Sequence, residues 1–180
     1  MFYLITGGSG SGKSEYAEEV ICRLWEQQRQ GKLFYIATMV PEAAETGAKI
    51  ERHRQMRDEK GFKTLEWYTD LAGAAKKITE DNPKSSVLLE CISNLAANEL
   101  YREEGAGPAA ETEIMAGIRA LQEGCRHVVV VTNEVCSEGP ANTALMQHYK
   151  QVLGRLNCRM AEAADRVIEV VYGIPVGVKG

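Results

Sequence analysis

An eight-residue segment near the amino terminus constrains the fold most strongly. Residues 7–14 fit the pattern G-x-x-x-x-G-K-[ST], in which glycines let backbone N–H groups turn inward around phosphates. An apolar run precedes the segment and an amphipathic run follows it, as a strand and a helix would. The residues expected to bind a nucleotide here are Gly7, Gly8, Ser9, Gly10, Ser11, Gly12, Lys13 and Ser14.

Two side chains of this loop carry specific chemistry. Lys13 is expected to reach the β- and γ-phosphates as a catalytic cation, and the Ser14 hydroxyl is expected to ligate Mg²⁺. The alternative is a flexible glycine-rich turn, which the strand and helix on the correct sides disfavour. The sequence therefore predicts binding of a nucleoside triphosphate.

The rest of the chain alternates apolar and amphipathic runs, which is typical of a parallel sheet covered by helices. We expect strands over residues 2–6, 33–38, 86–90, 127–132 and 166–172. We expect helices over residues 13–28, 42–60, 70–80, 94–104, 111–123 and 143–163. The predicted fold is an α/β, three-layer, P-loop NTPase-like fold with a mainly parallel central sheet and helices on both faces.

Composition favours one soluble domain over residues 1–180. The chain has 180 residues, of which 44% are hydrophobic and 26% charged, with a net charge of −4. This balance gives no basic face for nucleic acid. No apolar run approaches the roughly 20 residues that span a bilayer, and the amino-terminal run is expected to be a core strand, not a cleavable signal.

Cysteine usage points to the cytoplasm. The five cysteines are scattered and contain no C-x-x-C pair, so they signal neither a zinc site nor a disulfide framework. Reduced thiols of a cytoplasmic protein are the expected state.

Two of the predicted strands end in polar residues. Val87-Leu88-Leu89-Glu90 is an apolar run ending in an acid, and such an acid holds or orients Mg²⁺ in phosphate-loop NTPases. Thr132-Asn133-Glu134-Val135 follows another apolar run, where a ligand crevice and a simple helix cap or turn are equally compatible with the residues. We expect Glu90 to act in the nucleotide site.

His53 lies in a polar segment expected to be helical. Lys49 and Arg57 lie four residues to either side, so the three side chains share a helix face. Neighbouring cations favour neutral imidazole, which leaves a nitrogen free to attack phosphorus. From spacing alone, a solvated charged face is the better interpretation. His127 and His148 have no comparable setting and are interpreted as structural or surface residues.

Together these segments resemble the adenosylcobinamide kinase/adenosylcobinamide-phosphate guanylyltransferase family of cobalamin biosynthesis. The resemblance covers about 170 residues in order. Its segments are residues 5–14, 35–38, 49–57, 62–66, 88–92, 132–135, 154–157, 161–165 and 173–175.

The resemblance implies two reactions. The first phosphorylates adenosylcobinamide with ATP or GTP. The second uses GTP to make adenosylcobinamide-GDP and pyrophosphate through a guanylyl-histidine, which the family carries at the position of His53. The resemblance thus reverses the weighting of His53, and it implies that the polar segment around it is a candidate moving part.

The resemblance also implies a nucleotide site, a cofactor and an assembly. The implied cofactors and substrates are GTP, ATP, Mg²⁺, adenosylcobinamide and adenosylcobinamide phosphate, and the implied assembly is a homotrimer. Arg54 and Arg57 are expected to neutralise the α-phosphate. Beyond the phosphate loop, the implied GTP-binding residues are Thr38, Arg54, Gln55, Met56, Arg57, Glu66 and Glu90, with Ser14 and Glu90 at the metal.

The chain departs from the family's pattern in three places. Gly10 stands where the family often has Arg, and Phe62 where many members have Trp. Residues 136–140 replace a glycine-rich stretch, so corrinoid contacts are less firmly implied than nucleotide contacts.

Three other functions compete. A phosphate-loop kinase for a small alcohol would not need His53. A GTP-dependent switch usually carries an N-K-x-D motif to read the base, and no asparagine here is followed by lysine. A structural subunit would bind nucleotide without turnover. Bifunctional transfer ranks first and the kinase second.

Overall fold

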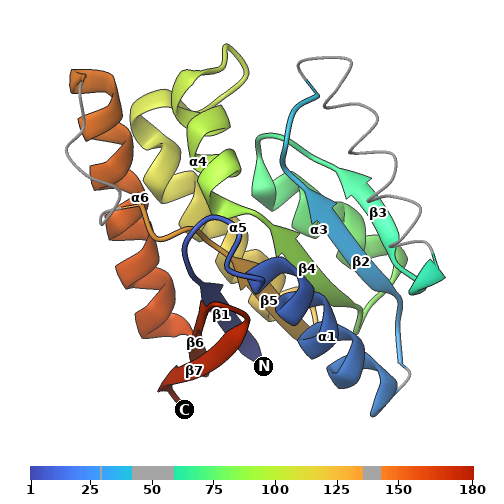
Figure 1. Cartoon of the computed structure of the whole chain (residues 1–180). Coiled ribbons are helices and arrows are strands. Elements are labelled where there is room, and N and C mark those ends of the chain that lie inside the picture. Colours follow the sequence, from blue (N-terminus) through green and yellow to red (C-terminus); the bar gives the residue numbers. More distant parts are fainter. Residues whose placement is uncertain (29, 42–58, 136–142) are drawn as a thin grey trace.

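A central sheet covered on both faces by helices forms the molecule (Figure 1). The computed structural model describes residues 1–28, 30–41, 59–135 and 143–180. The helices are α1 (Lys13–Glu26), α3 (Leu71–Asp81), α4 (Ile92–Tyr101), α5 (Ala110–Gly124) and α6 (Ala144–Ala163), with a short 3₁₀ helix η1 (Gly107–Ala109) before α5.

Seven strands make the sheet in the order β3-β2-β4-β5-β1-β6-β7. All neighbouring pairs are parallel except β6 and β7. The strands are β1 (Phe2–Thr6), β2 (Leu33–Ala37), β3 (Lys63–Glu66), β4 (Ser86–Glu90), β5 (His127–Val131), β6 (Arg166–Val171) and β7 (Ile174–Lys179). The predicted α/β class and mainly parallel sheet are confirmed.

The two faces of the sheet bury separate apolar clusters. On one face α1 packs against β4 and β5, with Ala17 and Ile21 fully buried. On the other face α3, α4, α5 and α6 cover a larger cluster that includes Leu89 and Val130 (Figure 1). β5 is buried along its whole length, which explains its continuous Val run, because strands covered on both faces have no polar side.

Two strands were not predicted, and both lie at sheet edges. β3 is a four-residue strand with exposed charged ends, too short and polar to show a strand pattern. β7 contains Pro175 and Gly177, which argue against a central strand but are tolerated at an edge. Among the described strands, β7 pairs with its inner neighbour β6 alone.

Most predicted boundaries lie within a few residues of those in the structure. The largest shift concerns α4, which begins at Ile92 instead of Asn94 and ends at Tyr101 instead of Glu104. Arg102 is extended, so the helix stops there. The predicted helix over 42–60 lies outside the described residues, except for its last two positions.

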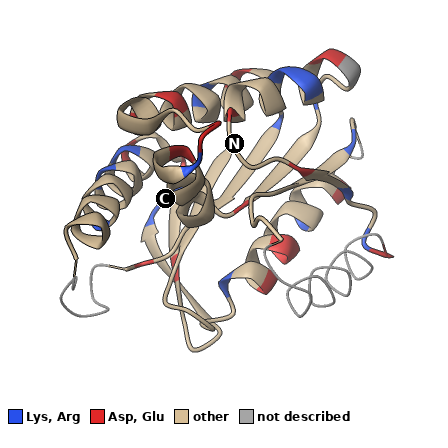
Figure 2. Cartoon of the chain, turned by 90° about the horizontal axis from the view of Figure 1, so that it is seen from above, with Lys and Arg blue, Asp and Glu red and all other residues tan. Residues whose placement is uncertain are grey.

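Charges of both signs are interspersed over the described part of the chain (Figure 2). Within that part, no helix combines the length and apolar character needed to cross a membrane.

Candidate nucleotide-binding site

The parallel strands bring the predicted site residues together at the carboxyl-terminal ends of the strands. Ala37 in β2 is in register with both Glu90 and Glu66, the last residues of β4 and β3. Glu90 is also in register with Val131, the last residue of β5. The phosphate loop leaves β1 at the same strand ends, where ligands bind in open α/β sheets.

Glycine geometry shapes the phosphate loop. Gly7 has φ 154°, and a Cβ atom there would lie 2.5 Å from the carbonyl oxygen of Val170 and 2.7 Å from Ser11 Oγ. Gly12 has φ 88° and caps the amino terminus of α1. The N–H of Gly173 donates to the carbonyl of Ser11 at 2.8 Å, so the turn between β6 and β7 stabilises the phosphate loop.

Lys13 is the first residue of α1 and lies back along the loop. Its Nζ donates to the carbonyl of Gly8 at 3.0 Å, and the residue is only 8% exposed. Ser11 Oγ is buried and has no hydrogen-bond partner among the described residues. A cation, an unsatisfied hydroxyl and the amino terminus of a helix together suit an anionic ligand.

Ser14 and Glu90 meet across the site although 76 residues separate them in the sequence. Ser14 Oγ donates to Glu90 Oε1 at 2.7 Å. A hydroxyl and a carboxylate at a phosphate loop are ligands suited to Mg²⁺, which usually also keeps waters and substrate phosphates. Among the described residues no group of three His, Cys, Asp or Glu side chains could hold a metal by itself. The pair therefore fits a metal that arrives with the nucleotide.

Thr38, the residue after β2, is fully buried and supports Glu90. Its Oγ1 accepts from the N–H of Cys91 at 2.7 Å and lies 3.0 Å from the carbonyl oxygen of Glu90 and 2.9 Å from that of Cys91. Burial, with a smaller contribution from the Glu90 charge, raises the pKa of the Cys91 thiol. The Thr38 hydroxyl thus fixes the backbone that carries Glu90.

Residues after β5 complete the site at the strand ends through contacts that the sequence did not predict. Asn133 Nδ2 donates to Ser93 Oγ at 2.8 Å, and Asn157 Nδ2 donates to the carbonyl of Asn133 at 3.3 Å. Asn157 lies in the helix predicted over residues 143–163, where a polar residue beside buried apolar ones was the available signal. Ser93 lies in α4 but precedes the helix predicted over residues 94–104, so no such signal was available for it.

Glu66 lines a separate hollow at the same strand ends. This cavity of about 380 Å³ is lined by Glu66, Trp67, Tyr68, Thr69, Asp70, Arg102 and Glu104. Tyr68 Oη donates to Glu66 Oε2 at 3.3 Å. Asn98 Nδ2 donates to the carbonyls of Thr38 and Tyr68, which ties this hollow to the end of β2.

Five predicted site residues lie outside the described part of the chain. They are His53, Arg54, Gln55, Met56 and Arg57. Their roles remain predictions.

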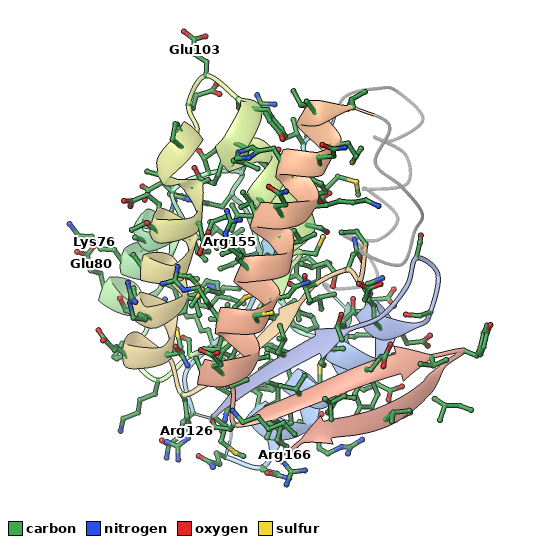
Figure 3. All side chains as sticks on the ribbon, turned by 90° about the vertical axis from the view of Figure 1, so that its left-hand side faces the viewer. Lys76, Glu80, Glu103, Arg126, Arg155 and Arg166 are labelled. Carbon is green, nitrogen blue, oxygen red and sulfur yellow. The ribbon has the colours of Figure 1, made fainter. Side chains whose placement is uncertain are left out.

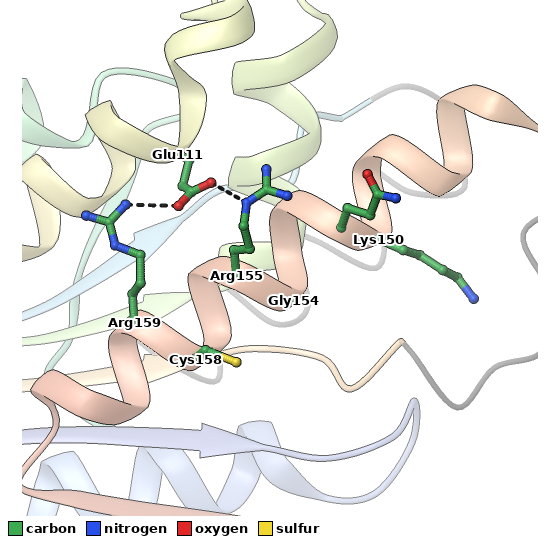
Figure 4. A pocket seen from close by; sticks show the side chains of 7 residues that line it. Glu111, Lys150, Gly154, Arg155, Cys158 and Arg159 are labelled. Atoms are coloured by element: carbon green, nitrogen blue, oxygen red, sulfur yellow. Dashed lines mark hydrogen bonds and ion pairs between the residues drawn. The ribbon is translucent and has the colours of Figure 1, made fainter.

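A larger hollow of about 610 Å³ lies between α5 and α6, away from the phosphate loop (Figure 4). Glu111 accepts there from Arg155 Nε at 2.7 Å and from Arg159 Nη1 at 3.0 Å. The hydrogen bond from Arg155 is the main cause that lowers the pKa of Glu111. None of the lining residues belongs to the strand ends, so this ion-pair cluster fastens two helices and is not part of the nucleotide site.

Solved structures share the fold at low sequence identity. A KaiC-like protein from Pyrococcus horikoshii matches with a TM-score of 0.51 at 13% identity, over 93% of this chain and 69% of that one. The flagellar accessory protein FlaH from Methanocaldococcus jannaschii matches with a TM-score of 0.53 at 13% identity, over 99% of this chain and 77% of that one. These likenesses bear on the fold alone.

Curated relatives are similar along their whole length. The bifunctional adenosylcobalamin biosynthesis protein CobU is 35% identical in Escherichia coli and in Salmonella typhimurium, over 99% of this chain and 100% of each relative. CobP of Pseudomonas aeruginosa is 29% identical over 98% of this chain and 96% of the relative. The family model for cobinamide kinase / cobinamide phosphate guanyltransferase matches residues 3–178. The chain belongs to the cobinamide kinase / cobinamide phosphate guanyltransferase family.

Proposed function

We propose that the protein phosphorylates adenosylcobinamide with ATP or GTP and then transfers GMP from GTP to the product. The observation that carries this proposal is the contact of Ser14 with Glu90 beside a complete phosphate loop, in a chain similar to bifunctional CobU over its full length. Family membership supplies the substrate class, and the site supplies the nucleotide chemistry.

In the kinase step, the hydroxyl oxygen of adenosylcobinamide attacks the γ-phosphorus of the nucleotide. A P–O bond to the acceptor forms, the bond between the γ-phosphorus and the β–γ bridging oxygen breaks, and a nucleoside diphosphate leaves. The O–H bond of the acceptor also breaks, and its proton passes to water. Lys13, only 8% exposed, exchanges its contact with the Gly8 carbonyl for the β- and γ-phosphates. Preorganised cations and N–H groups stabilise the charge of the transition state.

In the guanylyl step, a neutral ring nitrogen of His53 attacks the α-phosphorus of GTP. An N–P bond forms, the bond to the α–β bridging oxygen breaks, and pyrophosphate leaves. A phosphate oxygen of adenosylcobinamide phosphate then attacks the same phosphorus and releases His53. Arg54 and Arg57 neutralise the α-phosphate, and Gln55, Met56 and Glu66 complete the GTP site. Thr38 is fully buried and contributes to that site through the backbone at Glu90.

Ser14 and Glu90 would hold Mg²⁺, which when bound neutralises charge on the nucleotide phosphates. The 2.7 Å contact between their oxygens brings a hydroxyl and a carboxylate together before the ion arrives. Ser14→Ala removes the hydroxyl and is expected to weaken the Mg²⁺-dependent part of nucleotide binding.

Product analysis tests the two steps separately. Purified protein is incubated with adenosylcobinamide, GTP and Mg²⁺. The corrinoids are then separated by chromatography and identified by mass spectrometry. The proposal predicts adenosylcobinamide phosphate with GDP, followed by adenosylcobinamide-GDP with pyrophosphate. Adenosylcobinamide phosphate alone would leave the second candidate, a phosphate-loop kinase without guanylyl transfer. Recovery of unchanged corrinoid would contradict both.

We also propose that the protein works as a cytoplasmic homotrimer, on the ground of family membership. The β6–β7 hairpin offers apolar side chains to solvent that a second copy could cover. These are Tyr172, Ile174, Val176 and Val178, exposed by 94%, 65%, 46% and 63%. An exposed apolar edge strand is also a template for pairing with another chain, so covering it would remove a liability.

A further inference from the structure

β5 lies between the two strands that carry the halves of the nucleotide site. It pairs with β1, which leads into the phosphate loop, and with β4, which ends at Glu90. The residues that follow β5 continue beside the loop, since the N–H of Glu134 donates to the carbonyl of Gly7 at 3.3 Å. Asn133 is therefore placed between the loop and the Glu90 strand end.

Asn133 reaches the residue next to Glu90 through one intermediate. Its Nδ2 donates to Ser93 Oγ at 2.8 Å, and Ser93 Oγ lies 2.8 Å from Cys91 Sγ. Cys91 and Ser93 are 6% and 4% exposed, so few water molecules compete for these contacts. On its other side, Cys91 donates its N–H to Thr38 Oγ1 at 2.7 Å. Cys91 is thus held from β2 and from the segment after β5.

Helix α6 contacts both Asn133 and Ser93. Thr132 Oγ1 donates to Asn157 Oδ1 at 2.7 Å, and Asn157 Nδ2 donates to the carbonyl of Asn133 at 3.3 Å. Tyr149 Oη donates to the carbonyl of Ser93 at 3.1 Å. Because α6 fixes both ends of the Asn133–Ser93 contact, the amide has a defined direction.

We propose that Asn133 is a positioning residue which, through Ser93 and Cys91, sets the backbone at Glu90 so that its carboxylate faces Ser14. Fixed partners reduce the freedom that a metal-binding carboxylate loses when the ion binds. This inference rests on the proposed function, because it assigns Glu90 and Ser14 to the metal that accompanies the nucleotide. Asn133 acts through its neighbours and needs no contact with substrate.

Calorimetry of GTP binding, in Mg²⁺ and in EDTA, tests the inference on the full-length protein. The gain in affinity on adding Mg²⁺ is the quantity compared, because it isolates the Ser14–Glu90 pair from the rest of the loop. Asn133→Ala is expected to reduce this gain about tenfold, the scale of one lost buried hydrogen bond, and to leave the affinity in EDTA within about twofold. Ser93→Ala is expected to act alike, and the double variant to be no worse than either single one.

The matched control is Ser85→Ala. Ser85 is also buried, accepts from the N–H of Lys32 at 3.2 Å and donates to the carbonyl of Asn82 at 2.7 Å. It directly precedes β4 and therefore lies at the amino-terminal ends of the strands, opposite the nucleotide site. It is expected to lower stability without changing the Mg²⁺ gain. An unchanged gain in Asn133→Ala, or in Ser93→Ala where the first variant does not fold, would overturn the inference. Wild-type protein without any Mg²⁺-dependent GTP binding would instead overturn the proposed function.

Discussion

At the scale of single residues, the neighbouring glycines Gly7 and Gly8 of the phosphate loop have different structural roles. Gly7 is required by space, since a Cβ atom would approach a backbone carbonyl of β6. Gly8 has open space around its Cα, and its carbonyl is what Lys13 uses. The pattern of the loop does not distinguish these roles, whereas the structure does.

Gly7→Ala is therefore expected to lower the free energy of unfolding by about 2 kcal/mol or more, because the carbonyl of Val170 belongs to the backbone and cannot step aside. Gly8→Ala, the matched control, should change the free energy of unfolding by no more than about 0.5 kcal/mol. Urea denaturation of both variants checks the difference. Equal stabilities would contradict the loop geometry described above.

His127 predicts a pH dependence of stability. Burial, followed by the charges of the amino terminus and Arg126, lowers its pKa in the folded protein. Neither ring nitrogen has a hydrogen-bond partner among the described residues. The unfolded chain then binds the proton more readily than the folded one, so stability falls as pH drops below about 6.5.

Wild type is expected to lose stability between about pH 7.5 and 5.5, measured by denaturation at each pH. His127→Phe should remove most of this loss, and the exposed His148→Ala should keep it. The same pH dependence of stability in wild type and His127→Phe would show that His127 is not its cause.

At the scale of elements, α4 connects the site to the loops around it. Ser93 and Asn98 contact strand ends, and Glu99, only 2% exposed, accepts from the N–H groups of Asp70 at 2.7 Å and Ala106 at 2.8 Å. One helix thus fixes the loop before α3, the loop before η1 and the ends of β2 and β5.

Truncation of Glu99 is expected to leave two backbone donors without an acceptor. Glu99→Ala should lower the free energy of unfolding by about 2 to 4 kcal/mol, and Glu99→Gln by less, because an amide oxygen still accepts. Glu103→Ala is the control, since this exposed side chain points away from the molecule beyond the end of α4 (Figure 3). If Glu99→Ala were as stable as Glu103→Ala, Glu99 would not be the anchor of these loops.

At the scale of the whole molecule, regular patterns predicted the fold, whereas contacts that depend on helix packing were not predicted. Continuous apolar runs identified β4 and β5, and the alternation with helices identified the parallel sheet. The edge strands β3 and β7 carry no comparable burial pattern. The resemblance implies that Ser14 and Glu90 meet at the metal, although strand order, which brings them together, is specified by no local pattern. The contact of Asn133 with Ser93 depends on how helices pack and was not predicted.

Assembly is also a property of the whole molecule. If the proposed trimer forms through β7, Val178→Lys combined with Ile174→Lys should leave the protein monomeric, because two charges would be buried at the contact. Sedimentation velocity measures the mass directly. Leu145→Lys replaces another apolar side chain, 60% exposed on α6, and should leave the trimer intact. A trimer that persists in the double variant would exclude the β7 surface.

The most direct test of the central claim, bifunctional nucleotide transfer, is the capture of the covalent intermediate. Protein and GTP labelled at the α-phosphate are mixed with Mg²⁺, and intact mass and acid lability of the adduct are measured for wild type and His53→Ala. The account predicts an acid-labile, base-stable guanylyl adduct in wild type and none in His53→Ala. An adduct that persists in His53→Ala, or a wild type that phosphorylates adenosylcobinamide but never forms an adduct, would contradict it.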